Sequence, residues 1–136
     1  HSPDAVVNVL EAVREFTSGK VIAVLGCGGD RDSSKRPLMG QALMHGSDIA
    51  IFTSDNPRSE KPAEILTQMV GVISVESPSR VIEDRAEAIK YAVSLASAGD
   101  TVVILGKGHE TGQDIAGVIH EFDDRLVLAR EVEALS

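Results

Sequence analysis

Apolar residues recur at helical spacing near the start of the chain, and a continuous apolar run follows them. The helical positions are Val6, Val7, Leu10, Val13 and Phe16. Ser2 is a favourable N-cap for this helix and Pro3 a favourable first residue. The segment "SGK" ends the periodic pattern, and the run "VIAVLG" that follows is too short for another helix. We therefore predict a helix over residues 3–16 and a buried strand over residues 21–26.

The same alternation continues along the chain. Further helices are predicted at 37–45, 62–70 and 85–96, and further strands at 48–52, 80–84 and 101–106. The tail differs, because 113–122 is typical of two short strands about a glycine, and 123–135 of a closing helix capped by Asp123 or Asp124. Alternating helices and buried strands indicate an α/β fold: a Rossmann-like, mostly parallel sheet with helices on both faces and a short antiparallel edge hairpin.

Size and charge narrow the range of partners. A chain of 136 residues has the size of one domain. Its net charge of −8 disfavours nucleic acid and anionic lipid, and with no Trp, one Tyr and three Phe it has little surface for stacking bases. Cys27 is the only cysteine, and no run approaches the roughly 18 apolar residues of a membrane span. We expect a cytoplasmic protein that binds neither nucleic acid nor membranes.

Three polar loops each follow a predicted buried strand. They read "GCGGDRDSSKRP", "TSDNPRSEKP" and "GKGHETGQ". In open α/β sheets the carboxyl ends of parallel strands lie along one edge, and ligands bind in the crevice there. We therefore expect the three loops to face one another, although about 80 positions separate the first from the last.

Neither glycine-rich loop completes a nucleotide motif. In the first, Arg31 stands where a dinucleotide fingerprint needs its third glycine. In the third, Lys107 is followed by Gly108 instead of Ser or Thr, so a Walker loop is excluded as well. The charges that follow the glycines of the first loop, on Arg31, Lys35 and Arg36, favour a binding role, and a solvated charged loop remains the alternative. If the function requires a nucleotide, most of the residues that bind it must lie outside these two loops.

The "DNPR" stretch, residues 55–58, has two open interpretations. One is a plain turn, because Asp and Asn accept local backbone donors and Pro57 presets its φ. The other is a binding site for a zwitterion, because the planar guanidinium of Arg58 pairs with a carboxylate while Asp55 receives an ammonium group. In "GKGHE", Glu110 could accept a second ammonium group and Gly106 exposes a backbone carbonyl. His109 lacks spaced metal-ligand partners, so no metal site is predicted.

These loops and two further segments match a known family. The stretches "GCGGDRDSSKRPLMG", "TSDNPR" with "EKPAEI", "EDRAEAI", and "GKGHETGQ" with "FDDR" occur in the family's order and at compatible spacing. Over nearly its whole length the chain resembles the carboxy-terminal domain of the Mur ligases of peptidoglycan synthesis. Within that family it is most similar to the members that add meso-diaminopimelate to UDP-N-acetylmuramoyl-L-alanyl-D-glutamate.

The resemblance implies an amino-acid site. In the family "DNPR" is the recognition motif for meso-diaminopimelate, whereas lysine-adding relatives carry a tetrapeptide without the arginine. By this resemblance seven residues bind the amino acid: Arg31, Asp55, Asn56, Pro57, Arg58, Gly106 and Glu110. No catalytic residue and no metal ligand is expected in this domain.

The resemblance also implies where the remaining chemistry lies. In these ligases ATP phosphorylates the D-glutamate carboxyl group, and the amino group of the incoming amino acid attacks it. The ATP loop and magnesium ligands belong to a central domain and the UDP pocket to an amino-terminal one. Residues 1–136 then form a single carboxy-terminal domain without those two, inactive by itself. ATP and Mg²⁺ are expected for the full-length enzyme and not for this domain alone, although His1 corresponds to a family histidine near the nucleotide.

Three functions remain to be distinguished. The preferred one is the domain that binds and orients the amino acid in an amide-forming ligase. The second is a freestanding binding module for a dicarboxylic amino acid, without catalysis. The third is an interaction domain whose loops contact a neighbouring protein.

Overall fold

The computed structural model describes residues 2–29 and 33–105, together with the backbone of two short strands further on. Its helices are α1 (Pro3–Phe16), α2 (Arg36–Gly46), α3 (Pro62–Val70) and α4 (Arg85–Leu95), with a short 3₁₀ turn, η1 (Ser33–Lys35), before α2. Its strands are β1 (Val21–Cys27), β2 (Ile49–Ser54), β3 (Arg80–Val81), β4 (Thr101–Leu105), β5 (Gly112–Ile115) and β6 (Val118–Glu121). The predicted closing helix at 123–135 and its cap lie outside the described residues.

The main sheet is parallel, with strand order β3-β2-β1-β4. Strand order reverses at β1, because β2 and β3 follow on one side and β4 is added on the other. β5 and β6 pair antiparallel in a two-stranded sheet of their own. The predicted α/β class, parallel sheet and hairpin are confirmed, and the hairpin pairs with itself instead of extending the four-stranded sheet.

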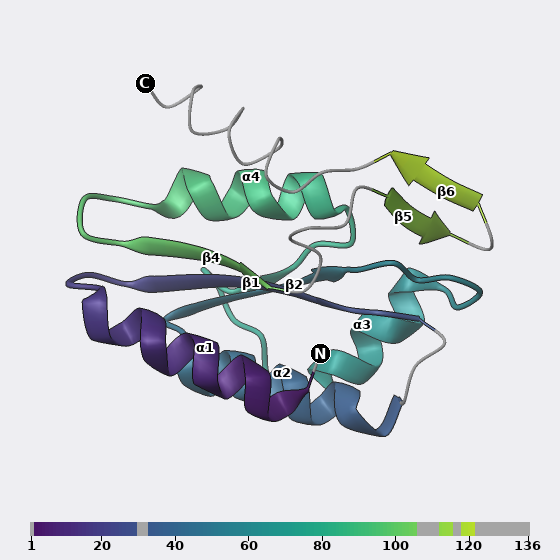
Figure 1. The fold of residues 1–136 in the computed structure, drawn as a ribbon, viewed down its shortest axis with the longest axis horizontal. Coiled ribbons are helices and arrows are strands. Elements are labelled where there is room, and N and C mark those ends of the chain that lie inside the picture. Colours follow the sequence, from purple (N-terminus) through teal and green to yellow (C-terminus); the bar gives the residue numbers. More distant parts are fainter. Residues whose placement is uncertain (1, 30–32, 106–111, 116–117, 122–136) are drawn as a thin grey trace.

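Helices cover both faces of the main sheet. Figure 1 shows α1, α2 and α3 below it and α4 above it. Alternate residues of β1 face the two layers: Val21, Ala23 and Leu25 pack in the core with α1–α3, whereas Ile22 and Val24 pack with α4. This explains the unbroken apolar run of β1, since a strand buried on both faces has no polar side.

Local chemistry sets where the helices begin. The Ser2 hydroxyl accepts a hydrogen bond from the Ala5 amide at 3.1 Å, and Pro3 is the first residue of α1. The Asp84 carboxylate caps α4 by accepting from the Glu87 amide at 3.0 Å. Within the described part of the chain, no helix is long and apolar enough to cross a membrane.

Two carboxylates secure the amino-terminal edge of the sheet. Asp48 accepts from the Val21 amide at 2.8 Å and from the Arg14 guanidinium at 2.9 Å. Asp100 accepts from the amides of Lys20 and Ser97 at 2.8 and 2.9 Å. The backbone hydrogen bonds, reinforced at Asp48 by Arg14, hold the pKa of each carboxyl below its usual range. The opposite, carboxyl edge of the sheet is left for the three loops.

Candidate functional site

The three loops singled out in the sequence begin at neighbouring strand ends. β1 lies between β2 and β4 in the sheet, and the pairing runs to Cys27 opposite Ser54 and to Leu25 opposite Leu105. The expected convergence at one edge of the sheet is therefore confirmed for the strand ends. It coincides with the reversal of strand order, where ligands bind in open α/β sheets.

The turn at 55–58 is held in an unusual backbone conformation. Asn56 has a φ of 38° and Arg58 a φ of 52°, both in the left-handed region. Asn tolerates this region, but for arginine it costs of order 1 kcal/mol, so the surrounding structure must impose it. The Glu60 amide closes the turn on the Pro57 carbonyl at 3.0 Å. Such imposed strain is concentrated at binding sites, which favours a functional role for this turn.

The first loop packs directly on this turn. The Gly29 amide donates to the Asn56 carbonyl at 3.0 Å, and Arg58 Nη1 donates back to the Gly29 carbonyl at 2.8 Å. A Cβ on Gly29 would lie 1.7 Å from the Pro57 carbonyl oxygen, so only glycine fits. Nη1 of Arg58 also reaches the Asn56 carbonyl at 3.3 Å. Among the described residues nothing accepts from Nε or Nη2 of Arg58, and these two donors suit a ligand carboxylate.

The buried guanidinium of Arg36 is hydrogen-bonded to the same two loops. Arg36, 2% exposed, donates to both carboxylate oxygens of Glu60 at 2.9 and 2.6 Å and to the Gly28 carbonyl at 2.9 Å. It also donates to Gln68 on α3 at 2.6 Å. A bidentate pair of this kind holds its partners in one geometry. Sequence reasoning had grouped Arg36 with the charges of the first loop and missed this supporting role, because Glu60 and Gln68 are brought to it only by the fold.

Arg85 is a second buried arginine whose role the sequence does not predict. Arg85 at the start of α4 is 2% exposed and donates to the carbonyls of Ser54 and Leu105 at 3.0 and 3.1 Å. In the sequence, Arg85 stands out only as part of the segment "EDRAEAI" that carries the family resemblance. No local sequence signal gives the role of Arg85, since its two acceptors lie 31 and 20 positions away.

Cys27 is a buried structural thiol. Its sulfur lies 3.8 Å from the Met39 sulfur, and burial raises its pKa to about 12, partly offset by the Arg36 charge. A thiol with this pKa is protonated at neutral pH and is a poor nucleophile. Cys27 therefore acts as a small apolar residue of the core.

The structure brings four of the predicted site residues together. Asp55, 3% exposed, and Pro57 are buried, whereas Asn56 and Arg58 are half-buried in the same turn. The remaining predicted residues lie outside the described part of the chain: His1, Arg31, Gly106 and Glu110. In the sequence, Arg31 follows Gly29 by two positions and Gly106 comes directly after Leu105.

The described residues include no cluster of metal ligands, and one amide of the glycine-rich first loop is already bonded. No cluster of three or more His, Cys, Asp or Glu among them could hold a metal ion. The Gly29 amide and carbonyl are engaged by Asn56 and Arg58, and the Gly28 carbonyl by Arg36. A phosphate cradle needs free backbone amides at a glycine-rich loop, and the Gly29 amide is not available for one.

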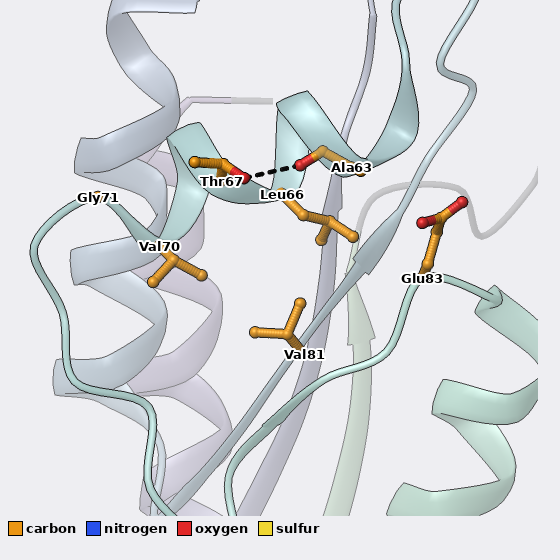
Figure 2. A pocket seen from close by; sticks show the side chains of 7 residues that line it. All are labelled: Ala63, Leu66, Thr67, Val70, Gly71, Val81 and Glu83. Atoms are coloured by element: carbon orange, nitrogen blue, oxygen red, sulfur yellow. Dashed lines mark hydrogen bonds between the residues drawn. The ribbon is translucent and has the colours of Figure 1, made fainter.

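A cavity of about 440 Å³ lies between α3 and the short strand β3. Its lining includes Ala63, Leu66, Thr67, Val70, Val81 and Glu83. Figure 2 shows apolar side chains around the space, with the Thr67 hydroxyl turned back to the Ala63 carbonyl at 2.9 Å. Its lining has no cation for a carboxylate, so it does not match an amino-acid site, and we assign the site to the loop edge.

The chain is similar to known proteins both in sequence and in fold. Residues 1–108 match the family model described as "Mur ligase, glutamate ligase domain". Two relatives are named UDP-N-acetylmuramoyl-L-alanyl-D-glutamate--2,6-diaminopimelate ligase: one from Streptomyces coelicolor, 55% identical over 98% of this chain, and one from Geobacillus thermodenitrificans, 52% identical over 98%. A solved structure of a ligase with the same name superimposes with a TM-score of 0.93 and 47% identity over 99% of this chain.

The chain corresponds to only part of these proteins. It spans 27% of the length of the two relatives and 28% of the chain in the solved structure.

Proposed function

Because this chain belongs to the Mur ligase family, we propose that it binds and orients the amino-acid substrate of a longer, ATP-dependent ligase. The proposed reaction joins meso-diaminopimelate to UDP-N-acetylmuramoyl-L-alanyl-D-glutamate in peptidoglycan synthesis, in the cytoplasm. The relatives that carry this name are 55% and 52% identical to the chain across nearly its whole length. In this proposal the UDP-linked dipeptide is bound by other parts of the full-length protein.

The observation that carries the proposal is the fixed geometry of Arg58. One nitrogen of its guanidinium is held by the Gly29 carbonyl at 2.8 Å, while the backbone is held at a φ of 52°. A guanidinium oriented in advance pairs with a carboxylate without losing side-chain entropy on binding. Asp55 lies three residues away in the same turn and supplies the opposite charge that an ammonium group needs.

The remaining contacts are part of the same proposal. Arg31, two positions after Gly29 in the sequence, would add a second positive charge, and Gly106 and Glu110, which follow β4 in the sequence, would complete the site. Asn56 and Pro57 shape the turn, since Asn56 tolerates the left-handed backbone and Pro57 is packed on Gly29. Together these seven residues would receive both ends of a zwitterion and a further carboxylate.

This arrangement accounts for selection of diaminopimelate over lysine. The two amino acids differ by one carboxylate, which Arg58 would bind. When lysine enters, the guanidinium is left without that partner in a half-buried site, which costs several kcal/mol for a charged group. A loss of about 4 kcal/mol corresponds to ~10³-fold discrimination.

The contribution of this chain to the reaction is orientation. Holding one amino group of the substrate at the correct distance from the activated carboxyl group lowers the entropic part of the barrier. ATP and Mg²⁺, which the family implies for carboxyl activation, are proposed to bind elsewhere in the full-length protein, with His1 near the nucleotide. By itself the chain is proposed to be inactive.

Substrate selectivity of the full-length ligase tests the proposal. We would measure kcat/KM for meso-diaminopimelate and for L-lysine with the wild type, Arg58→Ala and Arg58→Lys. The wild type should prefer meso-diaminopimelate by ~10³-fold, and Arg58→Ala should lose most of that preference by raising KM for meso-diaminopimelate. Arg58→Lys should recover part of this preference, because the new side chain keeps the positive charge but lacks the planar guanidinium that binds both carboxylate oxygens. A wild-type enzyme that uses lysine equally well, or an Arg58→Ala enzyme with unchanged selectivity, would refute it.

A titration separates this function from that of a freestanding binding module. We expect weak or no heat when meso-diaminopimelate is added to residues 1–136 alone, since the closed site needs the rest of the enzyme. Micromolar binding by the isolated chain would favour the freestanding module instead.

A further inference from the structure

Arg85 connects two strand ends that the sheet itself leaves unconnected. β1 lies between β2 and β4, so no backbone hydrogen bond joins the outer two. Nη1 of Arg85 donates to Ser54, the last residue of β2, at 3.0 Å, and Nη2 donates to Leu105, the last residue of β4, at 3.1 Å. The two arms of one rigid guanidinium therefore bridge these strands across the end of β1.

Gly26 makes room for this bridge. A Cβ on Gly26 would lie 2.8 Å from Nη1 of Arg85, 2.7 Å from the Ser54 carbonyl carbon and 2.8 Å from Cβ of Asp55. Any larger residue at this position of β1 would press on the guanidinium and on the start of the candidate site at once. The glycine of the first loop and the arginine of α4 thus form one arrangement.

Both residues bridged by Arg85 are next in sequence to residues of the proposed amino-acid site. Ser54 directly precedes Asp55, and Leu105 is the last described residue before "GKGHE". We propose that Arg85 is a positioning residue, which sets the spacing between the ends of β2 and β4 and thereby the geometry of the amino-acid site. This inference rests on the proposed function, because it names the residue that holds that site in shape.

The buried charge is suited to this task. A guanidinium presents donors in a fixed planar fork, so two carbonyls bound to its two arms are held at one separation. Lysine carries a single ammonium group on a flexible stem and would not hold both acceptors in the same way. Replacement of Arg85 should therefore loosen the site even where the charge is kept.

Kinetics of the full-length ligase test the role of Arg85. We would measure KM for meso-diaminopimelate, ATP and the UDP-linked dipeptide with Arg85→Met and Arg85→Lys. We expect KM for meso-diaminopimelate to rise at least tenfold in Arg85→Met and less in Arg85→Lys, while the other two KM values change less than twofold. The preference for meso-diaminopimelate over L-lysine should fall in parallel.

Two further variants separate positioning from stability. Ile89→Ala lies one turn along the same helix, fully buried, and should lower Tm with KM unchanged. Gly26→Ala keeps Arg85 but presses on its guanidinium and on Ser54 and Asp55, so it should raise the same KM. Arg85→Lys decides the matter if Arg85→Met does not fold. Unchanged KM in Arg85→Lys and Gly26→Ala, or an equal rise in Ile89→Ala, would overturn the inference. A wild-type enzyme that does not use meso-diaminopimelate would instead refute the proposed function.

Discussion

Gly29 is the residue at which the first loop and the "DNPR" turn depend most directly on each other. We expect Gly29→Ala to reduce the free energy of unfolding by about 2 kcal/mol and to raise KM for the amino acid. The reason is that the new Cβ would lie 1.7 Å from the Pro57 carbonyl oxygen, which must move and take the turn with it. Urea unfolding and steady-state kinetics of the full-length enzyme measure the two effects.

Gly46→Ala is the matched control. Gly46 ends α2, and the atoms nearest a Cβ there belong to the Leu10 side chain, Cδ1 at 2.7 Å and Cβ at 2.9 Å, so the change strains the contact with α1 instead of the two loops. Its KM should stay at the wild-type value. If Gly29→Ala behaves like this control, the close contact between the two loops does not matter for the site.

The rate at which the Cys27 thiol is alkylated tests whether this side chain is buried. Since burial raises the pKa of its thiol to about 12, iodoacetamide at pH 8 should modify the folded protein at least 100-fold more slowly than the protein in urea. Mass spectrometry over time measures both rates. Rapid alkylation of the folded protein would contradict the buried, protonated state. Residues 1–136, on which the measurement is made, contain one cysteine, so no second site obscures the result.

At the scale of elements, sequence and structure agree where an element carries its own signals. The helix predicted at 62–70 is α3, Pro62–Val70, because Pro62 starts it and Gly71, with a φ of 57°, ends it. The strand predicted at 80–84 is shorter, since β3 is only Arg80–Val81. Within the described residues, β3 pairs only with β2. The last contact with the sheet is the hydrogen bond from the Ile82 amide to the Phe52 carbonyl, and the chain leaves the sheet after it.

The cap of α4 gives a prediction at this scale. Asp84→Ala should lower the free energy of unfolding by about 1 kcal/mol, because the Glu87 amide loses its acceptor at 3.0 Å. Asp84→Ser should retain most of the stability, since serine caps a helix almost as well. Thermal or urea denaturation of the three proteins makes the comparison. Equal stability of the alanine and serine variants would show that the cap is not stabilising.

At the scale of the whole molecule, stability and binding are assigned to opposite edges of the sheet. Asp48 and Asp100 hold the amino-terminal edge, whereas Gly29, Arg36 and Arg85 organise the carboxyl edge. Changes at the first edge should therefore affect unfolding without affecting amino-acid affinity.

Asp48→Asn tests this separation and its pH dependence. The folded-state pKa of Asp48 is lowered, so its charge stabilises the fold above the unfolded pKa near 3.8, and this contribution is lost as the pH falls through the lower, folded value. We expect the variant to be less stable by at most about 1 kcal/mol at pH 7, since a charged acceptor is exchanged for a neutral one on a side chain that is 42% exposed and screened by solvent. The difference between variant and wild type should shrink below pH 4, while KM at pH 7 is unchanged.

Urea unfolding at several pH values measures this difference. Glu11→Gln, an exposed change on α1, is the control and should be neutral. A difference between Asp48→Asn and wild type that stays constant down to pH 2 would contradict the assigned cause.

The sequence by itself determined the α/β class, the order of elements and the turn at 55–58, because apolar periodicity, proline and glycine act over short distances. Only the tertiary structure decided which residues support that turn. Gly29 meets Pro57, Arg36 meets Glu60, and Arg85 reaches two strand ends through contacts between 20 and 31 positions apart in the chain. Such contacts leave no local pattern, since a buried charge is satisfied by whichever carbonyls and carboxylates the folded sheet brings beside it.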